Sequence, residues 1–400
     1  MTLDFRHYLT ITANYWAFTL TDGAIRMLVI LYFHQLGYSP LQIASLFIFY
    51  EFFGVVTNLI GGWIAARMGL KSTLVSGTAL QIMALLMLTV PETFLSAAYV
   101  MIAQAMSGIA KDLNKMSAKS SVKLLVKEGG EGRLFKWVAV LTGSKNTLKG
   151  AGFFLGAALL STVGFRYALF VLAGMLVISL AYSAVSLPSA MGRAKGKPKF
   201  TQLFSNSADI NWLSAARLFL FGARDIWFVI GLPVFLSSLG WSFNQVGGFL
   251  ALWIIGYGII QASAPKLLQS GAAQSAPDGK TAMRWVGFLV LIPAAIAFLL
   301  SRGYDPTLVV IIGLILFGIV FAINSAVHSY LILAYSDHNK VSMNVGFYYM
   351  ANAGGRLLGT ILSGWIYQQW GMQACLYWSS GFLLLAAIFT LQLTRSESVQ

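Results

Sequence analysis

Residues 36–43 read Leu-Gly-Tyr-Ser-Pro-Leu-Gln-Ile, and residues 239–246 read Leu-Gly-Trp-Ser-Phe-Asn-Gln-Val. At the same offset of 203 residues, Asp22 corresponds to Asp225. In both halves the aspartate lies in an apolar stretch that ends at this turn-like segment. The match predicts that the second half of the chain repeats the fold of the first half.

Two more pairs of motifs occur in the same order and at similar offsets. Residues 108–114, Gly-Ile-Ala-Lys-Asp-Leu-Asn, share their first two residues and their last with residues 318–324, Gly-Ile-Val-Phe-Ala-Ile-Asn. Residues 149–152, Lys-Gly-Ala-Gly, correspond to residues 356–359, Arg-Leu-Leu-Gly. Two parallel repeats are the plan of many secondary transporters, whose substrate sites lie near the bilayer midplane at the repeat interface.

The composition is that of an integral membrane protein. Hydrophobic residues make up 58% of the 400 residues and charged residues 10%, and the mean hydropathy is +0.74. A membrane-spanning helix needs about 20 apolar residues. We therefore predict an all-α membrane protein with 12 transmembrane helices in two six-helix bundles, centred near residues 20, 52, 85, 108, 150, 176, 221, 255, 292, 320, 355 and 382.

The positive charges indicate how the chain is oriented. Of 27 Lys and Arg residues, nine fall inside the apolar stretches, two in odd-to-even connections and 16 on the opposite side. Cytoplasmic loops carry such an excess, so both termini are predicted to be cytoplasmic, in a bacterial inner membrane. The net charge of +14 therefore needs no nucleic-acid partner. The predicted parts are an N-terminal bundle (1–187), a basic cytoplasmic linker (188–206) and a C-terminal bundle (207–400).

Cations inside the apolar stretches are the strongest functional signal. A charge near the bilayer centre costs about 2.5–3.5 kcal/mol on insertion scales. Four carboxylates lie at comparable depth, too few to pair all nine cations, so we expect a water-filled cavity that binds a multiply charged anion. The carboxylates are Asp22, Glu51, Asp112 and Asp225, and the cations are Arg26, Lys111, Lys115, Lys119, Lys145, Lys149, Arg217, Arg224 and Arg356.

Lysines recur every fourth residue in the fourth predicted helix, at positions 111, 115, 119 and 123. That spacing places them on one slowly drifting stripe. At about 1.5 Å per residue, Lys111 lies near the middle of the bilayer and Lys123 at the cytoplasmic surface. Lys123 can reach the interface, and Lys119 can do so too. Lys111 and Lys115 are the predicted substrate ligands.

The repeats give two further candidate ligands and the candidate proton carriers. Lys149 and Arg356 should occupy equivalent places in their helices, on opposite walls of one central cavity, where Arg can grip an oxyanion with two parallel hydrogen bonds. Asp22 has the spacing for an intrahelical pair with Arg26, while Glu51 has no cation nearby in sequence. All four intramembrane carboxylates are candidate proton carriers. Such charge pairs could equally be structural and lock helices together.

The remaining predicted ligands are cationic or neutral residues at similar depth. They are Lys145, Arg217, Arg224, Asn114 and its repeat mate Asn324. Polar residues of this kind also bond neighbouring helices, and His328 is better explained as such a packing residue. No aromatic residue is assigned to the site.

Nothing in the sequence suggests an enzyme. The chain lacks a His-Glu-x-x-His metal motif and a Gly-x-Ser-x-Gly nucleophile motif. A single cysteine, Cys375, excludes an internal disulfide and a multi-cysteine metal site. We therefore expect no catalytic residues, no metal and no cofactor.

The segment after the second helix, residues 62–71, reads Gly-Trp-Ile-Ala-Ala-Arg-Met-Gly-Leu-Lys. It resembles the Gly-x-x-x-Asp-Arg-x-Gly-Arg/Lys-Arg/Lys signature of the major facilitator superfamily, although Ala66 replaces the Asp and Leu70 a basic residue. The resemblance covers the whole chain and implies two six-helix bundles and alternating access. The departures put the usual charge relay on the cytoplasmic side in question.

Residues 107–123 and the segment Thr21-Asp22-Gly23-Ala24-Ile25-Arg26 resemble the ArsJ organoarsenical efflux permeases more specifically. That resemblance implies export of 1-arseno-3-phosphoglycerate, arsenate resistance and a functional link to glyceraldehyde-3-phosphate dehydrogenase, which makes the ester. We expect a monomer in the lipid bilayer. The alternatives are a carrier of ordinary phosphorylated metabolites or organic acids, and a flippase for anionic lipids.

Overall fold

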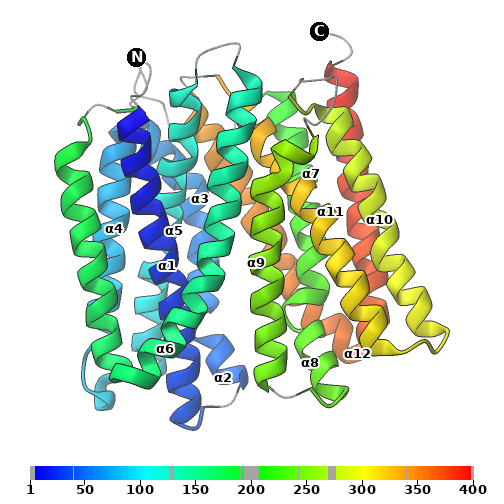
Figure 1. The fold of residues 1–400 in the computed structure, drawn as a ribbon, viewed down its shortest axis with the longest axis horizontal. Coiled ribbons are helices and arrows are strands. Elements are labelled where there is room, and N and C mark those ends of the chain that lie inside the picture. The colour runs from blue at the N-terminus through cyan, green and yellow to red at the C-terminus, as the bar shows by residue number, and fades with distance from the viewer. Residues whose placement is uncertain are drawn as a thin grey trace. The chain divides into compact units, whose positions relative to one another are not determined.

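The computed structural model of the chain describes residues 5–38, 40–126, 130–189, 191–192, 207–241, 243–268, 276–337 and 340–397. Every regular element in these ranges is a helix, so the all-α prediction is confirmed (Figure 1). The elements are α1 (Phe5–Gln35), α2 (Pro40–Ser45), α3 (Ile48–Met68), α4 (Leu70–Met87), the short 3₁₀ helix η1 (Glu92–Phe94), α5 (Ala97–Leu125), α6 (Glu131–Ser186), α7 (Ala208–Phe228), α8 (Gly231–Ser238), α9 (Phe243–Leu268), α10 (Gly279–Ser301), α11 (Pro306–Ala334) and α12 (Val341–Glu397).

Within the described residues, nine helical segments are long and apolar enough to cross a membrane. Two of them, α6 and α12, are kinked pairs of helices, with the kinks at Gly164 (φ 77°) and Gly371 (φ 72°). Glycine adopts this left-handed conformation without steric cost. The helix α5 is also long enough but carries the lysine stripe. Counting α5 and both halves of each kinked helix, these ranges contain the twelve predicted spans.

Several helices begin at side-chain caps that the sequence encodes. The Ser96 hydroxyl accepts from the Tyr99 amide at the start of α5, and Ser207 accepts from the Ile210 amide at the start of α7. Asp305 caps α11, whose first residue is Pro306. These caps satisfy amides that have no partner inside the helix, so they fix where each span enters.

Contacts within the chain define two compact units. Unit 1 comprises Met1–Gly130, Ser144–Ser205 and Ser336–Met350. In it, α5 packs against α1, α3 and α4, and these helices lie side by side in Figure 1. Its apolar core includes Phe18, Leu28 and Phe33, which are at most 1% exposed.

Unit 2 comprises Glu131–Gly143, Asn206–Tyr335 and Ala351–Gln400. Here α11 packs against α7, α9 and α10, which matches the arrangement around α5. Its core contains several aromatic residues among the aliphatic ones, and the rings of Trp227 and Phe317 meet edge to face at 5.0 Å. The repeat predicted from sequence is therefore visible in how each unit packs.

The predicted linker, residues 188–206, is described only in part, because residues 190 and 193–206 lie outside the described ranges. Its start is attached to unit 1. Lys71 Nζ donates to the Leu187 carbonyl at 2.6 Å, and the Leu70 amide donates to the Met191 carbonyl at 2.8 Å. The bundle boundaries at 187 and 207 stay predictions.

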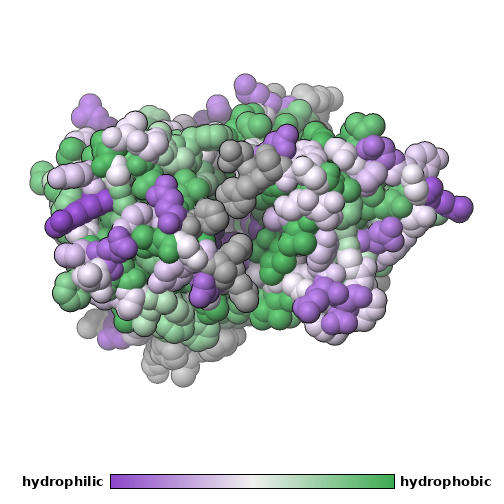
Figure 2. Space-filling model, turned by 90° about the horizontal axis from the view of Figure 1, so that it is seen from below, coloured by the Kyte–Doolittle hydropathy of each residue, from purple (hydrophilic) through white to green (hydrophobic). Residues whose placement is uncertain are grey.

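The surface suits a lipid environment. Large apolar side chains such as Ile178, Leu291 and Ile312 are between 64% and 73% exposed along their helices, as contact with lipid requires. Figure 2 shows one face of the surface, seen from below the view of Figure 1. On that face polar residues form separate patches among apolar ones.

Candidate functional site: charge clusters within each unit

In unit 1, α1 and α6 are joined by a buried ion pair. Lys149 Nζ lies 3.1 Å from Asp22 Oδ2, and the Asp22 side chain is 4% exposed. Arg26 Nη2 lies 3.1 Å from Glu51 Oε1 on α3. The sequence suggested an Asp22–Arg26 pair and a Glu51 with no nearby cation. The structure instead pairs each residue across helices, which spacing along a single helix does not reveal.

A second group in unit 1 places two lysines on one carboxylate. Lys115 Nζ lies 2.5 Å from Asp112 Oδ1, and Lys111 Nζ lies 3.8 Å from Asp112 Oδ2. The Asp112 side chain is 1% exposed, while the lysines are 18% and 14% exposed. We call Lys111, Asp112 and Lys115 the lysine triad. Further along α5, Lys119 is buried and Lys123 is half-buried.

Unit 2 contains the corresponding group built from arginines. Arg224 Nη2 lies 2.5 Å from Asp225 Oδ1, and Arg356 Nε lies 3.1 Å from Asp225 Oδ2. The Asp225 side chain is 0% exposed, whereas that of Arg356 is 34% exposed. We call Arg224, Asp225 and Arg356 the arginine triad. Its central carboxylate is buried, whereas about a third of the Arg356 side chain is exposed.

The sequence repeat has a direct structural meaning. Asp22 pairs with Lys149 in unit 1 as Asp225 pairs with Arg356 in unit 2. Three residues after each cation, a glycine lets the helices touch. A Cβ on Gly152 would overlap the Leu20 carbonyl oxygen, and one on Gly359 would lie 2.5 Å from the Gly222 oxygen. The Lys/Arg-x-x-Gly motif therefore brings the cation to the carboxylate of the facing helix.

Aromatic rings surround the charges, and the sequence interpretation missed them. Lys111 Nζ lies 3.9 Å from the ring centroid of Tyr50, and Lys115 Nζ lies 4.6 Å from that of Tyr349. In unit 2, Arg224 Cζ lies 5.0 Å from the Phe221 ring centroid. Ring faces attract cations. Aromatic residues make up 14% of the chain, so composition could not single these out.

Of the other predicted ligands, Arg217, Asn114 and Lys145 form side-chain hydrogen bonds, whereas both side-chain amide atoms of Asn324 are buried without a hydrogen-bond partner among the described residues. Arg217 Nε donates to Asn352 Oδ1 at 2.9 Å, and Arg217 Nη1 donates to Ser325 Oγ at 3.1 Å. Asn324, next to Ser325, is fully buried. These bonds tie α7, α11 and α12 together inside unit 2.

In unit 1, Asn114 Nδ2 lies 3.4 Å from Thr78 Oγ1, and Thr78 donates to Asn14 Oδ1 at 3.0 Å. Lys145 Nζ donates to Asn146 Oδ1 at 3.2 Å. The Asn114–Thr78 bond connects α5 to α4, and the Thr78–Asn14 bond connects α4 to α1. Asn114 thus bonds a neighbouring helix, which is the alternative to substrate binding that the sequence allows for such residues.

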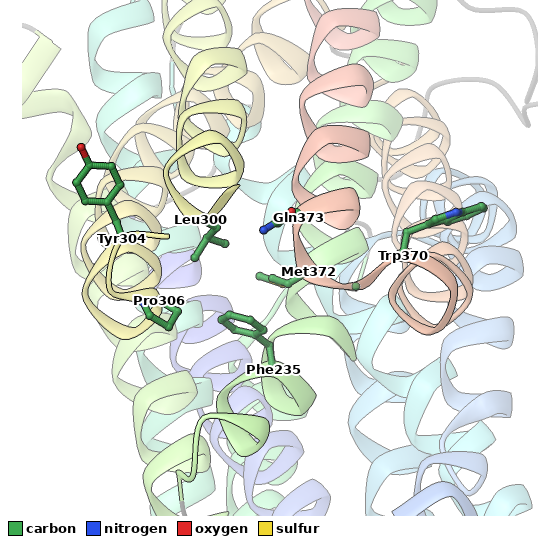
Figure 3. A pocket seen from close by; sticks show the side chains of 8 residues that line it. Phe235, Leu300, Tyr304, Pro306, Trp370, Met372 and Gln373 are labelled. Atoms are coloured by element: carbon green, nitrogen blue, oxygen red, sulfur yellow. The ribbon is translucent and has the colours of Figure 1, made fainter. Parts of the chain in front are cut away.

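A pocket lies elsewhere in unit 2. It has a volume of about 330 Å³. Figure 3 shows it between the ends of α8 and α10, the start of α11 and the kink of α12; its lining residues are Phe235, Leu300, Tyr304, Pro306, Trp370, Gly371, Met372 and Gln373. None of them is a predicted site residue. Among the described residues, no group of three or more His, Cys, Asp or Glu could hold a metal ion.

Comparisons with known structures agree with this architecture. A bacterial homologue of the iron transporter ferroportin in an outward-facing state has a TM-score of 0.76 and 14% identity, over 97% of this chain and 99% of that one. The human organic anion transporter MFSD10 (TETRAN) has a TM-score of 0.73 and 19% identity, over 96% and 99%. The E. coli fucose:proton symporter FucP gives 0.73 and 11%, over 96% and 97%. No curated protein sequence matches the chain.

Long apolar helices and the fold shared with these structures define a multi-pass helical membrane protein. The sequence profile of the Major Facilitator Superfamily matches residues 11–332, so the chain belongs to that superfamily. The resemblance noted around residues 62–71 is thereby confirmed at the level of the superfamily.

Proposed function

We propose that this transporter exports a multiply charged organic anion by alternating access, and that the anion is an arsenate ester, 1-arseno-3-phosphoglycerate. Export of this ester would confer arsenate resistance. The ester would come from glyceraldehyde-3-phosphate dehydrogenase acting on arsenate in place of phosphate. The proposed setting is a monomer in the bacterial inner membrane with both termini in the cytoplasm.

The observation that carries the proposal is the composition of the two triads. In each, one buried carboxylate holds two cations, Lys111 and Lys115 on Asp112 or Arg224 and Arg356 on Asp225. Each triad therefore bears one net positive charge inside the helices. Such a charge is costly in lipid, and an anionic ligand offsets that cost.

The donor chemistry favours oxyanions. Arg356 bonds Asp225 through Nε, and its side chain is one-third exposed; we expect its guanidinium to bind phosphate or arsenate oxygens. A guanidinium matches such groups with paired hydrogen bonds, while lysine ammonium groups act as mobile point charges. One structural neighbour is a human organic anion transporter, which supports an organic anion as the substrate class.

The proposal that the substrate is an arsenate ester rests on the resemblance of residues 21–26 and 107–123 to the ArsJ permeases. Pentavalent arsenic in such an ester presents oxygen atoms, whereas trivalent arsenic prefers thiolates. The chain has one cysteine, Cys375, which is buried. The oxygen-binding triads and this cysteine content both fit an arsenate ester.

Everted membrane vesicles provide the test, because export in cells becomes accumulation inside the vesicle. Vesicles containing the transporter should accumulate arsenic when the dehydrogenase, its substrates and arsenate generate the ester outside. They should not do so when the dehydrogenase is omitted. Accumulation of arsenate itself, or none above vesicles lacking the transporter, would contradict the assignment.

The same vesicles test the second candidate, a carrier of ordinary phosphorylated metabolites. The triads would bind a phosphate ester by the same contacts, so geometry alone favours neither substrate. Labelled 3-phosphoglycerate should compete weakly with the arsenate ester if the ester is the physiological cargo. Transport of 3-phosphoglycerate at an equal or greater rate would favour the second candidate.

A further inference from the structure

Tyr50 contacts three of the charged groups in unit 1. Its hydroxyl donates to Asp22 Oδ1 at 2.7 Å. Its ring centroid lies 3.9 Å from Lys111 Nζ and 5.2 Å from Arg26 Cζ. The side chain comes from α3, while these partners belong to α1 and α5. Tyr50 is thus a neutral residue at the junction of the Asp22–Lys149 pair and the lysine triad.

The backbone at Tyr50 is held in place by a close helix contact. A Cβ on Gly108 of α5 would lie 2.5 Å from the Tyr50 carbonyl oxygen and 3.0 Å from its Cα. Tyr50 is 3% exposed. Closely packed helices leave its ring little room to move, so its hydroxyl and ring face keep a fixed relation to the charges.

The two equivalent carboxylates differ in what binds their Oδ1 atoms. Asp22 Oδ1 accepts the neutral Tyr50 hydroxyl, whereas Asp225 Oδ1 accepts the Arg224 guanidinium. Asp22 Oδ2 is the atom that pairs with Lys149. A buried carboxylate oxygen that loses its donor incurs a desolvation cost and attracts another donor. Near Asp22, the cations that could respond are Lys111 and Arg26.

We propose that Tyr50 is a positioning residue for anion binding: by satisfying Asp22 Oδ1 without a charge, it keeps Lys111 and Arg26 from being drawn to Asp22. Its ring face also holds Lys111 in place. This role rests on the proposed function, since it concerns the affinity of the same cationic site. Tyr50 would then raise the affinity for the anion although it carries no charge itself.

The first test replaces Tyr50 in the full-length transporter in detergent, with 3-phosphoglycerate as the probe and Kd measured by calorimetry. Tyr50→Phe removes the hydroxyl but keeps the ring, and should weaken binding about tenfold, the equivalent of about 1.4 kcal/mol. Tyr50→Leu also removes the cation–ring contact and should weaken binding a further threefold or so. Tyr99→Phe is the matched control, because the Tyr99 hydroxyl bonds the Met87 carbonyl, and it should leave Kd unchanged.

The second test separates positioning from a general structural role. In an Asp22→Asn background the buried carboxylate that would draw Lys111 and Arg26 away is absent, so adding Tyr50→Phe should change Kd less than twofold. If the Asp22→Asn protein does not fold, a Lys111→Gln background replaces it. There the difference between Tyr50→Phe and Tyr50→Leu should disappear, because Lys111 is the cation held closest to the ring.

The outcomes distinguish this inference from the proposed function. If the wild-type protein binds 3-phosphoglycerate and Tyr50→Phe binds it equally well, the positioning role is wrong while the proposed function stands. An equal loss in the wild-type and Asp22→Asn backgrounds would also overturn it, because that loss would be structural. If the wild-type protein binds neither 3-phosphoglycerate nor the arsenate ester, the proposed function fails as well.

Discussion

Asp112 and Asp225 each hold two cations, and this ratio governs the chemistry at the scale of single residues. A buried ion pair loses its hydration, and its mutual attraction offsets only part of that cost. A second cation on the same carboxylate is stabilised less than the first, because the first cation already neutralises the negative charge of the carboxylate. The second cation is therefore the one that an incoming anion can recruit at least cost.

Removing one triad cation should abolish transport without unfolding the protein. Lys111→Gln and Arg356→Gln each leave the triad electrically neutral, and deleting a charge inside the membrane lowers the cost of insertion. Both variants should reach the membrane at wild-type levels but lose arsenic accumulation in everted vesicles, by at least tenfold. Wild-type accumulation in either variant would refute the assignment of its triad.

Arg356→Lys tests geometry at constant charge. A lysine can still pair with Asp225 but cannot offer the paired donors of a guanidinium. Accumulation should fall to an intermediate level, with a raised KM for the anion. A variant indistinguishable from wild type would show that Arg356 supplies charge alone, and a variant as inactive as Arg356→Gln would show that the fork is indispensable.

The sequence predicted these residues better than it predicted their partners. The repeat related Asp22 to Asp225 and Lys149 to Arg356, but it did not predict that Lys149 pairs with Asp22 and Arg356 with Asp225. Tyr50 could not be found, because its partners lie on two other helices, α1 and α5. Ion pairs within one helix can be predicted from the spacing of residues in the sequence, whereas ion pairs between helices depend on how the helices pack.

At the scale of helices, glycine sets the distance between α1 and α6. Gly152 lies against Gly23, where a Cβ would be 3.0 Å from the Gly23 Cα. Small residues let membrane helices approach closely, and interfaces between such helices are enriched in them. The Lys149–Asp22 pair lies one turn away, so its geometry depends on this approach.

Gly152→Ala should therefore separate α1 from α6 and weaken both stability and anion binding. A methyl group at this site overlaps the Leu20 carbonyl oxygen, and overpacking of this kind costs about 1–3 kcal/mol. The melting temperature of the purified protein should fall by several degrees. Gly174→Ala, on the same helix but with open space around its added Cβ, should leave it unchanged.

The helices themselves were largely predictable, since length and apolarity determine them. The kinks fall at Gly164 and Gly371, and both glycines adopt positive φ. The exception is instructive: α5 contains charged residues at five positions between 111 and 123, so apolarity alone leaves it out. The span that a search by hydropathy misses is therefore the one that carries the lysine triad.

At the scale of the whole molecule, the twofold repeat gives each unit a charge cluster of its own. Unit 1 uses mainly lysines, with one Arg–Glu pair, and unit 2 uses arginines. The carboxylates also differ in access to water: the Glu51 side chain is 30% exposed, while that of Asp22 is 4% exposed. A proton carrier must meet water during the transport cycle, which favours Glu51 over Asp22 for that role.

Coupling to protons is therefore predicted to depend on Glu51. In everted vesicles with an acidic interior, wild-type protein should concentrate the anion as protons leave, whereas Glu51→Gln should lose this response. Downhill exchange of anion should survive in Glu51→Gln, because both triads are intact. Asp22→Asn, the matched control, should weaken anion binding or stability but keep its response to the pH gradient, since its partner Lys149 belongs to the binding cluster. A Glu51→Gln transporter that still concentrates the anion when the interior is acidified would refute this choice.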